Sequence, residues 1–391
     1  MNLSQDQATV LKALIHWYKS KNKTQFITLG GYAGTGKTTL IAIIKKALDK
    51  IHEEKKQKIK MAFCSYTGRA TQNLKTTLKE HQVLNRRDTV STIHGLIYDP
   101  VETSNGVIIG WKKKTEIKAG LIIVDEASMI DEFIWNDLLS FDVPIIAVGD
   151  HGQLAPINGS FNLMENPNLK LENIHRHVAG NPIIKISTDA RKYGKINPGS
   201  YSNNVIKYSS NNYNYHDASE NLLENYTNDM LVLCGYNSTR VKINQFIRNA
   251  FGFDLPEPQV SDRVICLRNN HNKNIYNGML GTIKSIDTSQ KTFYDVEIKM
   301  DDIEKNYSGK IYAPQFNSIK PINFTKDRGK IGLSDLFDFG YALTVHKAQG
   351  SQARKVVLFE ERSSKMDDDR WRRWLYTGVT RAQNELYLFG E

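Results

Sequence analysis

A glycine-rich stretch that ends in lysine and threonine has the residue types and spacing to bind a nucleoside triphosphate. It reads Gly31-Tyr32-Ala33-Gly34-Thr35-Gly36-Lys37-Thr38-Thr39. Glycines let backbone N–H groups turn toward phosphates at the positive end of the helix that follows. In this pattern Lys37 reaches the β and γ oxygens, and Thr38 can hold Mg²⁺. We therefore expect Gly34 through Thr39 to bind ATP or GTP.

The residues on either side predict the strand and the helix that such a loop requires. Apolar residues 26–29 precede the loop as a buried strand, and apolar residues 40–44 follow it on the core face of a helix. A chance match in a flexible loop would lack the preceding strand and the following helix. The context therefore favours a phosphate-binding loop.

Two carboxylates follow a second apolar run. Residues 121–124 predict a buried strand, and Asp125 and Glu126 come directly after it. In proteins with this type of loop, the first acid holds Mg²⁺ through its water shell and the second polarises the attacking water. The pair therefore predicts hydrolysis. The alternative is an acidic pair that only caps the next helix.

A third apolar run, residues 145–148, leads into a polar loop at the same edge of the predicted sheet. Gln153 in this loop could sense the γ-phosphate, and Asn158 could face a bound polymer.

Composition indicates the broad class of the protein. The chain has 391 residues, a formal net charge of +10 and a pI near 9.2, which favours a polyanionic partner. The three cysteines are far apart in sequence, which gives no support to a zinc site or a disulfide framework. No signal-like N-terminus and no apolar run near the roughly 20 residues needed to span a bilayer are visible. We expect a reduced, cytoplasmic protein.

The pattern of strands and helices predicts two α/β units, each with a parallel sheet. The second unit begins at residues 230–234, continues with a helix over 239–251, and resumes with strands at 341–345, 355–359 and 385–389. Residues 197–216 are rich in Asn, Ser and Tyr, and we expect them to form a surface connection.

Two insertions interrupt this scheme. In residues 97–117, Asn105-Gly106 separates two strand-like runs and predicts a protruding β-hairpin. Residues 258–321 contain short, closely spaced strand-like runs without helices, which predicts a small β-barrel.

In this order the segments resemble the superfamily 1 helicases, specifically the RecD-like and Dda-like branch that moves 5′ to 3′ on single-stranded DNA. The resemblance covers nearly the whole chain. The segments that carry it are 3–7, 31–39, 66–70, 89–94, 121–126, 341–351 and 375–382. The match at 341–351 is the longest of these segments.

The resemblance implies a fold of two RecA-like domains, with a pin hairpin and a small SH3-like β-barrel inserted. The parts expected are domain 1A at 1–96 and 118–185, the 1B pin at 97–117, domain 2A at 186–257 and 322–391, and the SH3-like domain 2B at 258–321.

The resemblance also implies roles for residues that no isolated pattern would single out. Gln7 would read the adenine edge, with Gln5 the less suitable candidate by spacing. Arg381 and Arg176 would act as arginine fingers, although Arg176 could be an ordinary surface residue. Gly350 and Arg240 would contact nucleotide, and a plain helix-face charge explains Arg240 equally well.

The same resemblance supplies the candidate DNA contacts. Hydroxyl, imidazole and backbone N–H groups bind phosphate without reading sequence. The candidates are Thr67, Gly68, Arg69, Thr92, His94, Asn158, Thr344, His346, Lys347 and Ser351. Taken alone, the segments around Thr67 and Thr92 would more often be polar helix caps. Tyr98 or Trp111 could stack on the last base pair at the pin, although packing at the hairpin base is the more common role of such an aromatic residue.

The function implied is that of an ATP-dependent DNA helicase with ATP and Mg²⁺ as cofactors, acting as a monomer on single-stranded DNA and on junctions with duplex. Replication proteins are candidate partners, and a phage origin would place the protein in the host cytoplasm. Two rivals stay open: an ATP-switched clamp on single-stranded nucleic acid, and an RNA-directed motor.

Overall fold

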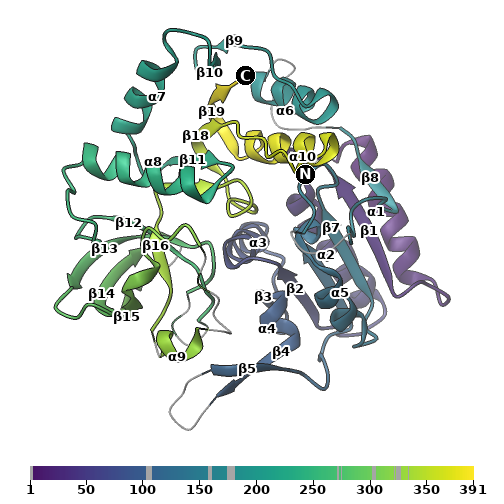
Figure 1. The fold of residues 1–391 in the computed structure, drawn as a ribbon. Coiled ribbons are helices and arrows are strands. Elements are labelled where there is room, and N and C mark those ends of the chain that lie inside the picture. The colour runs from purple at the N-terminus through teal and green to yellow at the C-terminus, as the bar shows by residue number, and fades with distance from the viewer. Residues whose placement is uncertain are drawn as a thin grey trace. The chain divides into compact units, whose positions relative to one another are not determined.

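The computed structural model describes residues 3–102, 108–156, 161–173, 181–270, 273, 275–301, 305–320, 322, 327–332 and 334–391. The chain divides into two compact units, Met1–Ala179 and Gly180–Glu391. Figure 1 shows the elements of both. The boundary predicted at 185 to 186 is wrong in detail, because it would cut helix α6, which runs over Pro182–Tyr193 in the second unit.

The first unit has a six-stranded sheet in the order β3-β2-β6-β7-β1-β8, with all neighbouring strands parallel. Its strands are β1 (Phe26–Gly31), β2 (Met61–Ser65), β3 (Thr89–Thr92), β6 (Leu121–Asp125), β7 (Ile145–Gly149) and β8 (Leu169–Leu171). Its helices are α1 (Gln5–Lys19), α2 (Lys37–Glu54), α3 (Gly68–Glu80), α4 (Ile93–Ile97) and α5 (Glu132–Leu139), with a 3-10 turn, η1, over Ala127–Met129. The strands predicted at 26–29, 121–124 and 145–148 are confirmed.

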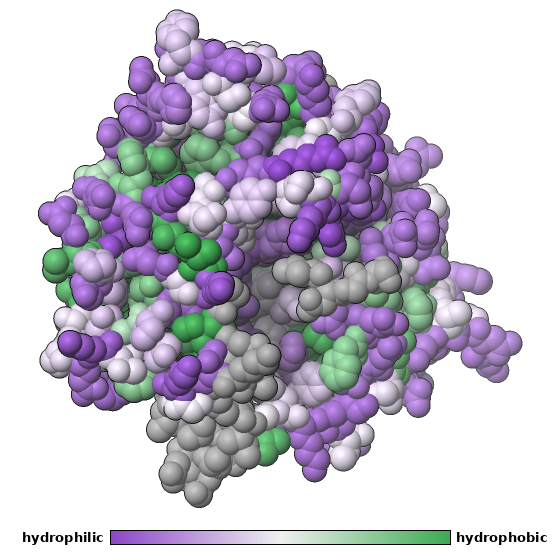
Figure 2. Space-filling view, viewed as in Figure 1, coloured by the Kyte–Doolittle hydropathy of each residue, from purple (hydrophilic) through white to green (hydrophobic). Residues whose placement is uncertain are grey.

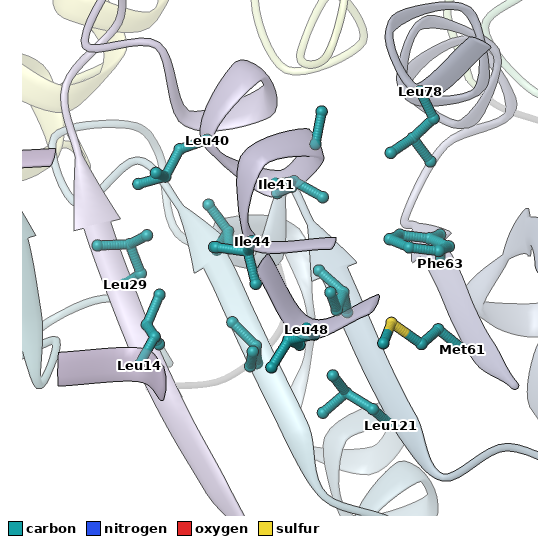
Figure 3. Packing of buried hydrophobic residues seen from close by; sticks show 14 of the residues in the cluster. Leu14, Leu29, Leu40, Ile41, Ile44, Leu48, Met61, Phe63, Leu78 and Leu121 are labelled. Carbon is teal, nitrogen blue, oxygen red and sulfur yellow. The ribbon is translucent and has the colours of Figure 1, made fainter. Parts of the chain in front are cut away.

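The central strands are apolar throughout because helices cover both faces of the sheet. In β6, Leu121 and Ile123 pack with α1, α2 and α3 in one core. Ile122 and Val124 pack with α4 and α5 in the core on the opposite face. Figure 3 shows the first of these cores, where α2 places Ile41, Ile44 and Leu48 over the strands.

The second unit repeats this strand order. Its sheet runs β17-β11-β18-β19-β10-β9, and its strands are β9 (Gly199–Ser202), β10 (Val205–Ser209), β11 (Met230–Cys234), β17 (Ala342–Thr344), β18 (Ala353–Phe359) and β19 (Ala382–Gly390). Five of these strands are parallel and β9 is antiparallel. Numbered along the chain from β1 and from β10, the five shared strands of both units follow the order 3-2-4-5-1. The expectation of two like α/β units is therefore confirmed.

Helices also cover both faces of the second sheet. Helices α7 (Tyr215–Glu224) and α8 (Asn237–Ala250) pack on one face through a core that includes Val232, Ile247 and Val357. Helices α6 and α10 (Asp368–Val379) pack together, and Trp371 Nε1 of α10 donates to Gly194 O at the end of α6 at 2.8 Å.

The prediction of a surface connection over residues 197–216 is wrong. These residues form β9 and β10, and β10 lies inside the sheet beside β19. Lys207 is buried in β10, and its ammonium pairs with Glu360 at 2.6 Å. The composition is polar because this buried strand carries an ion pair in place of an apolar side chain.

An antiparallel sheet of five strands is inserted in the second unit, in the order β15-β14-β13-β12-β16. Its strands are β12 (Arg263–Cys266), β13 (Leu280–Asp287), β14 (Phe293–Met300), β15 (Tyr307–Tyr312) and β16 (Phe337–Phe339), with the short helix α9 (Arg328–Ile331) and a 3-10 turn, η3 (Ala313–Gln315). Asp335 curls the sheet back on itself, because its N–H and C=O groups bond to Lys310 O and Tyr312 N of β15. β16 lies past residue 321, so the sheet extends beyond the range predicted for the insertion.

A β-hairpin projects from the first unit at the predicted place. β4 (Tyr98–Glu102) pairs antiparallel with β5 (Ile108–Lys113), and Pro100 lies opposite Trp111. The Asn105-Gly106 turn lies outside the described residues.

Large apolar side chains are few on the surface. Figure 2 shows one face on which hydrophilic residues dominate and hydrophobic residues form small, separate groups. In the part of the chain that the structure describes, no helix is long and apolar enough to cross a membrane.

Candidate functional site

The glycine-rich loop after β1 adopts the backbone that its glycines predict. Gly34 has φ 85° and Gly36 has φ 77°, in the left-handed region where side chains are disfavoured. Gly36 caps the N-terminus of α2, and a Cβ atom there would lie 2.9 Å from Gln7 Nε2. The loop therefore delivers Lys37 and Thr38 as the first residues of a helix whose positive end faces the loop.

Lys37 lies over the loop that precedes it. Its ammonium donates to Gly31 O at 2.7 Å and to Tyr32 O at 3.0 Å. It also lies 3.8 Å from Asp150 Oδ2, and the lysine side chain is 12% exposed. The ammonium is thus held at the loop that would cradle phosphates.

Thr38 and Asp125 meet at the C-terminal edge of the sheet. Thr38 Oγ1 donates to Asp125 Oδ2 at 3.1 Å, and Asp125 Oδ1 accepts from the Glu126 N–H at 2.9 Å. Burial and the neighbouring Glu126 raise the pKa of Asp125 to about 6. The hydroxyl and the carboxylate are hard oxygen donors of the kind that Mg²⁺ takes.

Glu126 is strained and has one oxygen without a protein partner. Its backbone is left-handed with φ 54°, which is uncommon for a residue with a side chain. Its Oε2 atom is buried, and no described residue hydrogen-bonds to it. Among the described residues, no group of three or more His, Cys, Asp or Glu side chains could hold a metal ion by itself. A site with one carboxylate, one hydroxyl and a free carboxylate oxygen suits Mg²⁺ that is also held by phosphates.

The raised pKa of Asp125 predicts the pH dependence of metal binding. A carboxyl with a pKa near 6 is protonated at pH 5, whereas an ordinary aspartate is ionised there. We expect Mg²⁺ affinity to fall below pH 6 by up to roughly tenfold per pH unit, because the metal must displace that proton. Mn²⁺ titrations in the presence of ADP, between pH 5 and 8, would measure this. Asp125→Asn should bind Mn²⁺ weakly and keep only the pH dependence that the ADP phosphates contribute, and a wild-type profile no steeper than that of the variant would contradict the prediction.

Asp150 is a candidate site residue that the sequence interpretation did not single out. It is buried at the end of β7, where its Oδ1 accepts from the Gly152 N–H at 2.9 Å and its Oδ2 from Gln153 Nε2 at 3.2 Å. Gln153 is thereby linked through one carboxylate to Lys37. The signal was present, since Asp150 follows strand residues 145–149 as Asp125 ends strand 121–125.

Gln7 lies beside the loop, as its assignment requires. Its Nε2 donates to Thr35 O at 3.1 Å, while its Oε1 accepts from the Ser4 N–H at 3.2 Å in a capping box of α1. The amide therefore ties α1 to the phosphate loop. Recognition of adenine by Gln7 stays a prediction.

The candidate DNA contacts of the first unit lie at the C-terminal ends of the edge strand β3 and of its neighbour β2. Thr67 and Thr92 cap α3 and α4, with Oγ1 accepting from the Ala70 N–H at 3.2 Å and from the Gly95 N–H at 3.1 Å. Gly68 is buried in the first turn of α3, and Arg69 follows it. The capping alternative is thus realised for both hydroxyls, and DNA contact there stays a prediction.

The second unit has the same arrangement after the equivalent strand. β3 leads into Thr92-Ile93-His94. β17, the third strand of its sheet when counted from β10, leads into Thr344-Val345-His346. Thr344 Oγ1 accepts from the Lys347 N–H at 3.4 Å, as Thr92 accepts from the residue three positions on. The two segments therefore occupy matching places in two like sheets.

The surroundings of Lys347 disfavour the charged form of its side chain. Burial and the nearby Arg240 lower its pKa to about 8. Burial and Arg370 likewise lower the pKa of His346. A neighbouring anion would stabilise the charged forms of both side chains.

Arg381 is buried at the end of α10. Its guanidinium donates to Thr377 O at 2.9 Å, to Ser351 O at 3.0 Å and to Thr380 Oγ1 at 3.2 Å. Gly350, with φ 75°, precedes Ser351. The structure thus joins the segment 341–351 to the segment 375–382 within the second unit.

The assignment of Arg240 to nucleotide is wrong for this arrangement. Its guanidinium is buried, pairs with Asp338 at 2.9 Å, and donates to Ser318 O at 2.9 Å and Asn237 Oδ1 at 3.3 Å. These contacts fasten α8 to the inserted sheet. Two further candidates, Asn158 and Arg176, lie outside the described residues.

The two aromatic candidates of the hairpin have different environments. Tyr98 is buried at the hairpin base, where its hydroxyl donates to Asp137 Oδ2 at 2.5 Å. Trp111 is 39% exposed on β5. Tyr98 therefore serves as an anchor at the hairpin base, which was the more common alternative, and contact of Trp111 with DNA stays a prediction.

Family models match both units. An AAA domain model matches residues 16–159, and a model of the UvrD-like helicase C-terminal domain matches residues 339–389. The RecD subunit of the RecBCD enzyme from Buchnera aphidicola is 27% identical over 94% of this chain and 70% of its own length. The ATP-dependent RecD2 DNA helicase of Deinococcus radiodurans is 25% identical over 99% of this chain.

The chain resembles the RecD-like and Dda-like superfamily 1 helicases, as its sequence motifs predict. The ATP-dependent DNA helicase dda of phage T4 is 30% identical over 45% of this chain. The chain spans about half the length of RecD2 and 40% of dda. The RecD2 and dda relatives are named as ATP-dependent DNA helicases, and the roles of the loop, Asp125 and Glu126 in hydrolysis stay predictions.

Solved structures of another helicase share the fold. Bacteroides Pif1 bound to single-stranded DNA has a TM-score of 0.58 and 17% identity, covering 99% of this chain and 92% of its own. A Pif1 structure on forked duplex DNA also has a TM-score of 0.58. At this identity the likeness supports the fold of two RecA-like domains.

Proposed function

We propose that this protein is an ATP-dependent DNA helicase that moves 5′ to 3′ along single-stranded DNA and unwinds duplex ahead of it. The observation that carries the proposal is the contact of Thr38 with Asp125, beside the unpartnered Glu126 oxygen. This arrangement is suited to hydrolysis as well as to binding.

Thr38 and Asp125 would hold Mg²⁺, which neutralises charge on the β and γ phosphates when bound. The Lys37 ammonium binds the same phosphates, and the Glu126 carboxylate orients water for attack. We assign Arg381 and Arg176 to the charge that develops on the γ-phosphoryl group. Gln153 reports on that group through Asp150 and Lys37.

The second unit cannot repeat this chemistry. The position that corresponds to the phosphate loop follows β10 and reads Ser210-Asn211-Asn212-Tyr213-Asn214, without glycine or lysine. We therefore propose that one ATP binds for each pair of units. Its hydrolysis alters how the second unit binds DNA.

The grip on DNA is assigned to matching segments of the two units. Thr67, Thr92 and His94 would hold the strand from one unit, and Thr344, His346 and Lys347 from the other. These groups bind backbone phosphates without reading bases, as a motor that moves along any sequence requires. The net charge of +10 supports a polyanionic partner.

Unwinding of duplexes that carry one single-stranded tail tests the proposal. We expect ATP-dependent unwinding of 5′-tailed and not of 3′-tailed duplexes, with ATP hydrolysis stimulated by single-stranded DNA. Unwinding confined to 3′-tailed duplexes would refute the direction. DNA-stimulated hydrolysis without unwinding or movement would favour the clamp, and stimulation by RNA alone would favour an RNA-directed motor.

The hairpin β4–β5 is proposed as the pin that separates strands, with the inserted antiparallel sheet as an SH3-like domain. Trp111→Ala should lower the unwinding rate about tenfold, because base stacking on an aromatic ring is worth roughly 1–3 kcal/mol. DNA-stimulated ATP hydrolysis should be retained. Tyr193→Ala, which removes an aromatic that is 71% exposed on α6, is the control and should leave unwinding unchanged. Equal losses of unwinding rate in both variants would argue against the role of the hairpin as a pin.

A further inference from the structure

Ser65, the last residue of β2, has a buried hydroxyl without a protein partner. Its side chain is fully buried, and within the described part of the chain no group hydrogen-bonds to its Oγ atom. An unpartnered buried hydroxyl is costly and uncommon in a native structure. Neither the sequence interpretation nor the function proposed above uses Ser65.

The strand register places Ser65 beside Asp125. The two residues are partners in the parallel pairing of β2 with β6. Neighbouring strands lie about 4.8 Å apart. No other described strand lies between the hydroxyl and the carboxylate.

The alternation of side chains places both residues on the face covered by α2. Phe63 and Ile123 lie two positions earlier in their strands and pack in the core beneath α2. Side chains in a strand return to the same face every second residue. Thr38, at the start of α2, bonds to Asp125 on that face. The Ser65 hydroxyl is therefore on the nucleotide side of the sheet.

The groups around Ser65 are already engaged. Asp125 Oδ2 accepts from Thr38 and Oδ1 accepts from the Glu126 N–H. On the other side, the register partner Thr92 accepts from the Gly95 N–H. Among the described residues no group is left to bond the Ser65 hydroxyl, which is therefore available to a ligand.

We propose that Ser65 is a positioning residue of the nucleotide site, whose hydroxyl accepts a hydrogen bond from a water molecule held by Mg²⁺. The proposal rests on the proposed ATP hydrolysis at Asp125. It explains why a polar residue occupies a fully buried position where alanine would fit the strand. Hydrogen bonds to groups that surround a metal orient them and raise affinity for the metal.

The test separates metal affinity from nucleotide affinity. ADP binding is measured by calorimetry without divalent metal, and Mn²⁺ binding to the ADP complex by electron paramagnetic resonance. In Ser65→Ala we expect Mn²⁺ affinity to fall about fivefold, the effect of one hydrogen bond. Metal-free ADP affinity should stay unchanged. Ser65→Thr keeps the hydroxyl and should retain more Mn²⁺ affinity than Ser65→Ala.

Cys64→Ala is the matched control. Cys64 is the preceding residue, fully buried, and packs in the core on the opposite face. It should leave both affinities unchanged. Unchanged Mn²⁺ affinity in Ser65→Ala, or a parallel loss of metal-free ADP affinity, would overturn the role of Ser65. Absence of ADP binding by the wild-type protein would instead refute the proposed nucleotide site.

Discussion

Lys37→Ala is expected to lower ATP hydrolysis by about a thousandfold, because one charged group that stabilises the transferring phosphoryl is lost from a preorganised site. The ammonium lies at the glycine-rich loop, bonded to Gly31 O and Tyr32 O, so no other described lysine is placed to replace it. Steady-state hydrolysis with saturating single-stranded DNA measures the effect. DNA binding without nucleotide should be largely spared.

The control for this variant lies on the same helix. Lys46 is an exposed lysine of α2, and Lys46→Ala removes the same charge without touching the loop. It should hydrolyse ATP at the wild-type rate. Because Lys37→Ala also removes a cation that lies 3.8 Å from the buried Asp150 carboxylate, a thermal melt should accompany the assay. A folded Lys37→Ala protein that turns over ATP normally would remove Lys37 from the mechanism.

Glu126→Gln is expected to lower the hydrolysis rate by at least about a hundredfold while leaving ATP binding intact. The amide keeps the shape of the side chain but cannot take a proton from water. The buried, unpartnered Oε2 atom and the left-handed backbone indicate that this carboxylate is held for a ligand. Single-turnover hydrolysis and binding of a fluorescent ATP analogue distinguish the two steps.

Glu132→Gln is the comparison for Glu126→Gln, since Glu132 is an exposed carboxylate in the first turn of α5. Normal hydrolysis by Glu126→Gln would reassign the acidic pair to the capping of η1. Trapping of ATP without hydrolysis should also let this variant hold DNA without moving along it.

The sequence predicted those strands whose side chains are apolar on both faces of the sheet. Residues 121–124 are all hydrophobic because helices cover both faces of β6, and the run is visible without knowledge of any partner. β10 escaped detection because Lys207, at its centre, is buried through an ion pair with Glu360, 153 positions away. A partner so distant in sequence leaves no local pattern.

The same distinction applies to the site. Lys37, Thr38 and Asp125 follow local motifs, and the structure brings them together as predicted. Arg240 was misassigned because its partner Asp338 lies 98 positions further along the chain. Ser65 was missed because a hydroxyl at the end of a strand acquires meaning only from the residue beside it in the sheet.

The shared strand order of the two units has a consequence for how this chain can be altered. The two sheets have one plan, but the loop after the first shared strand is glycine-rich in the first unit and lacks glycine and lysine in the second. The difference in chemistry therefore lies in the loops at the strand ends and not in the order of the strands. Loop exchange between the halves, rather than redesign of their cores, is therefore the natural route to engineering such a motor.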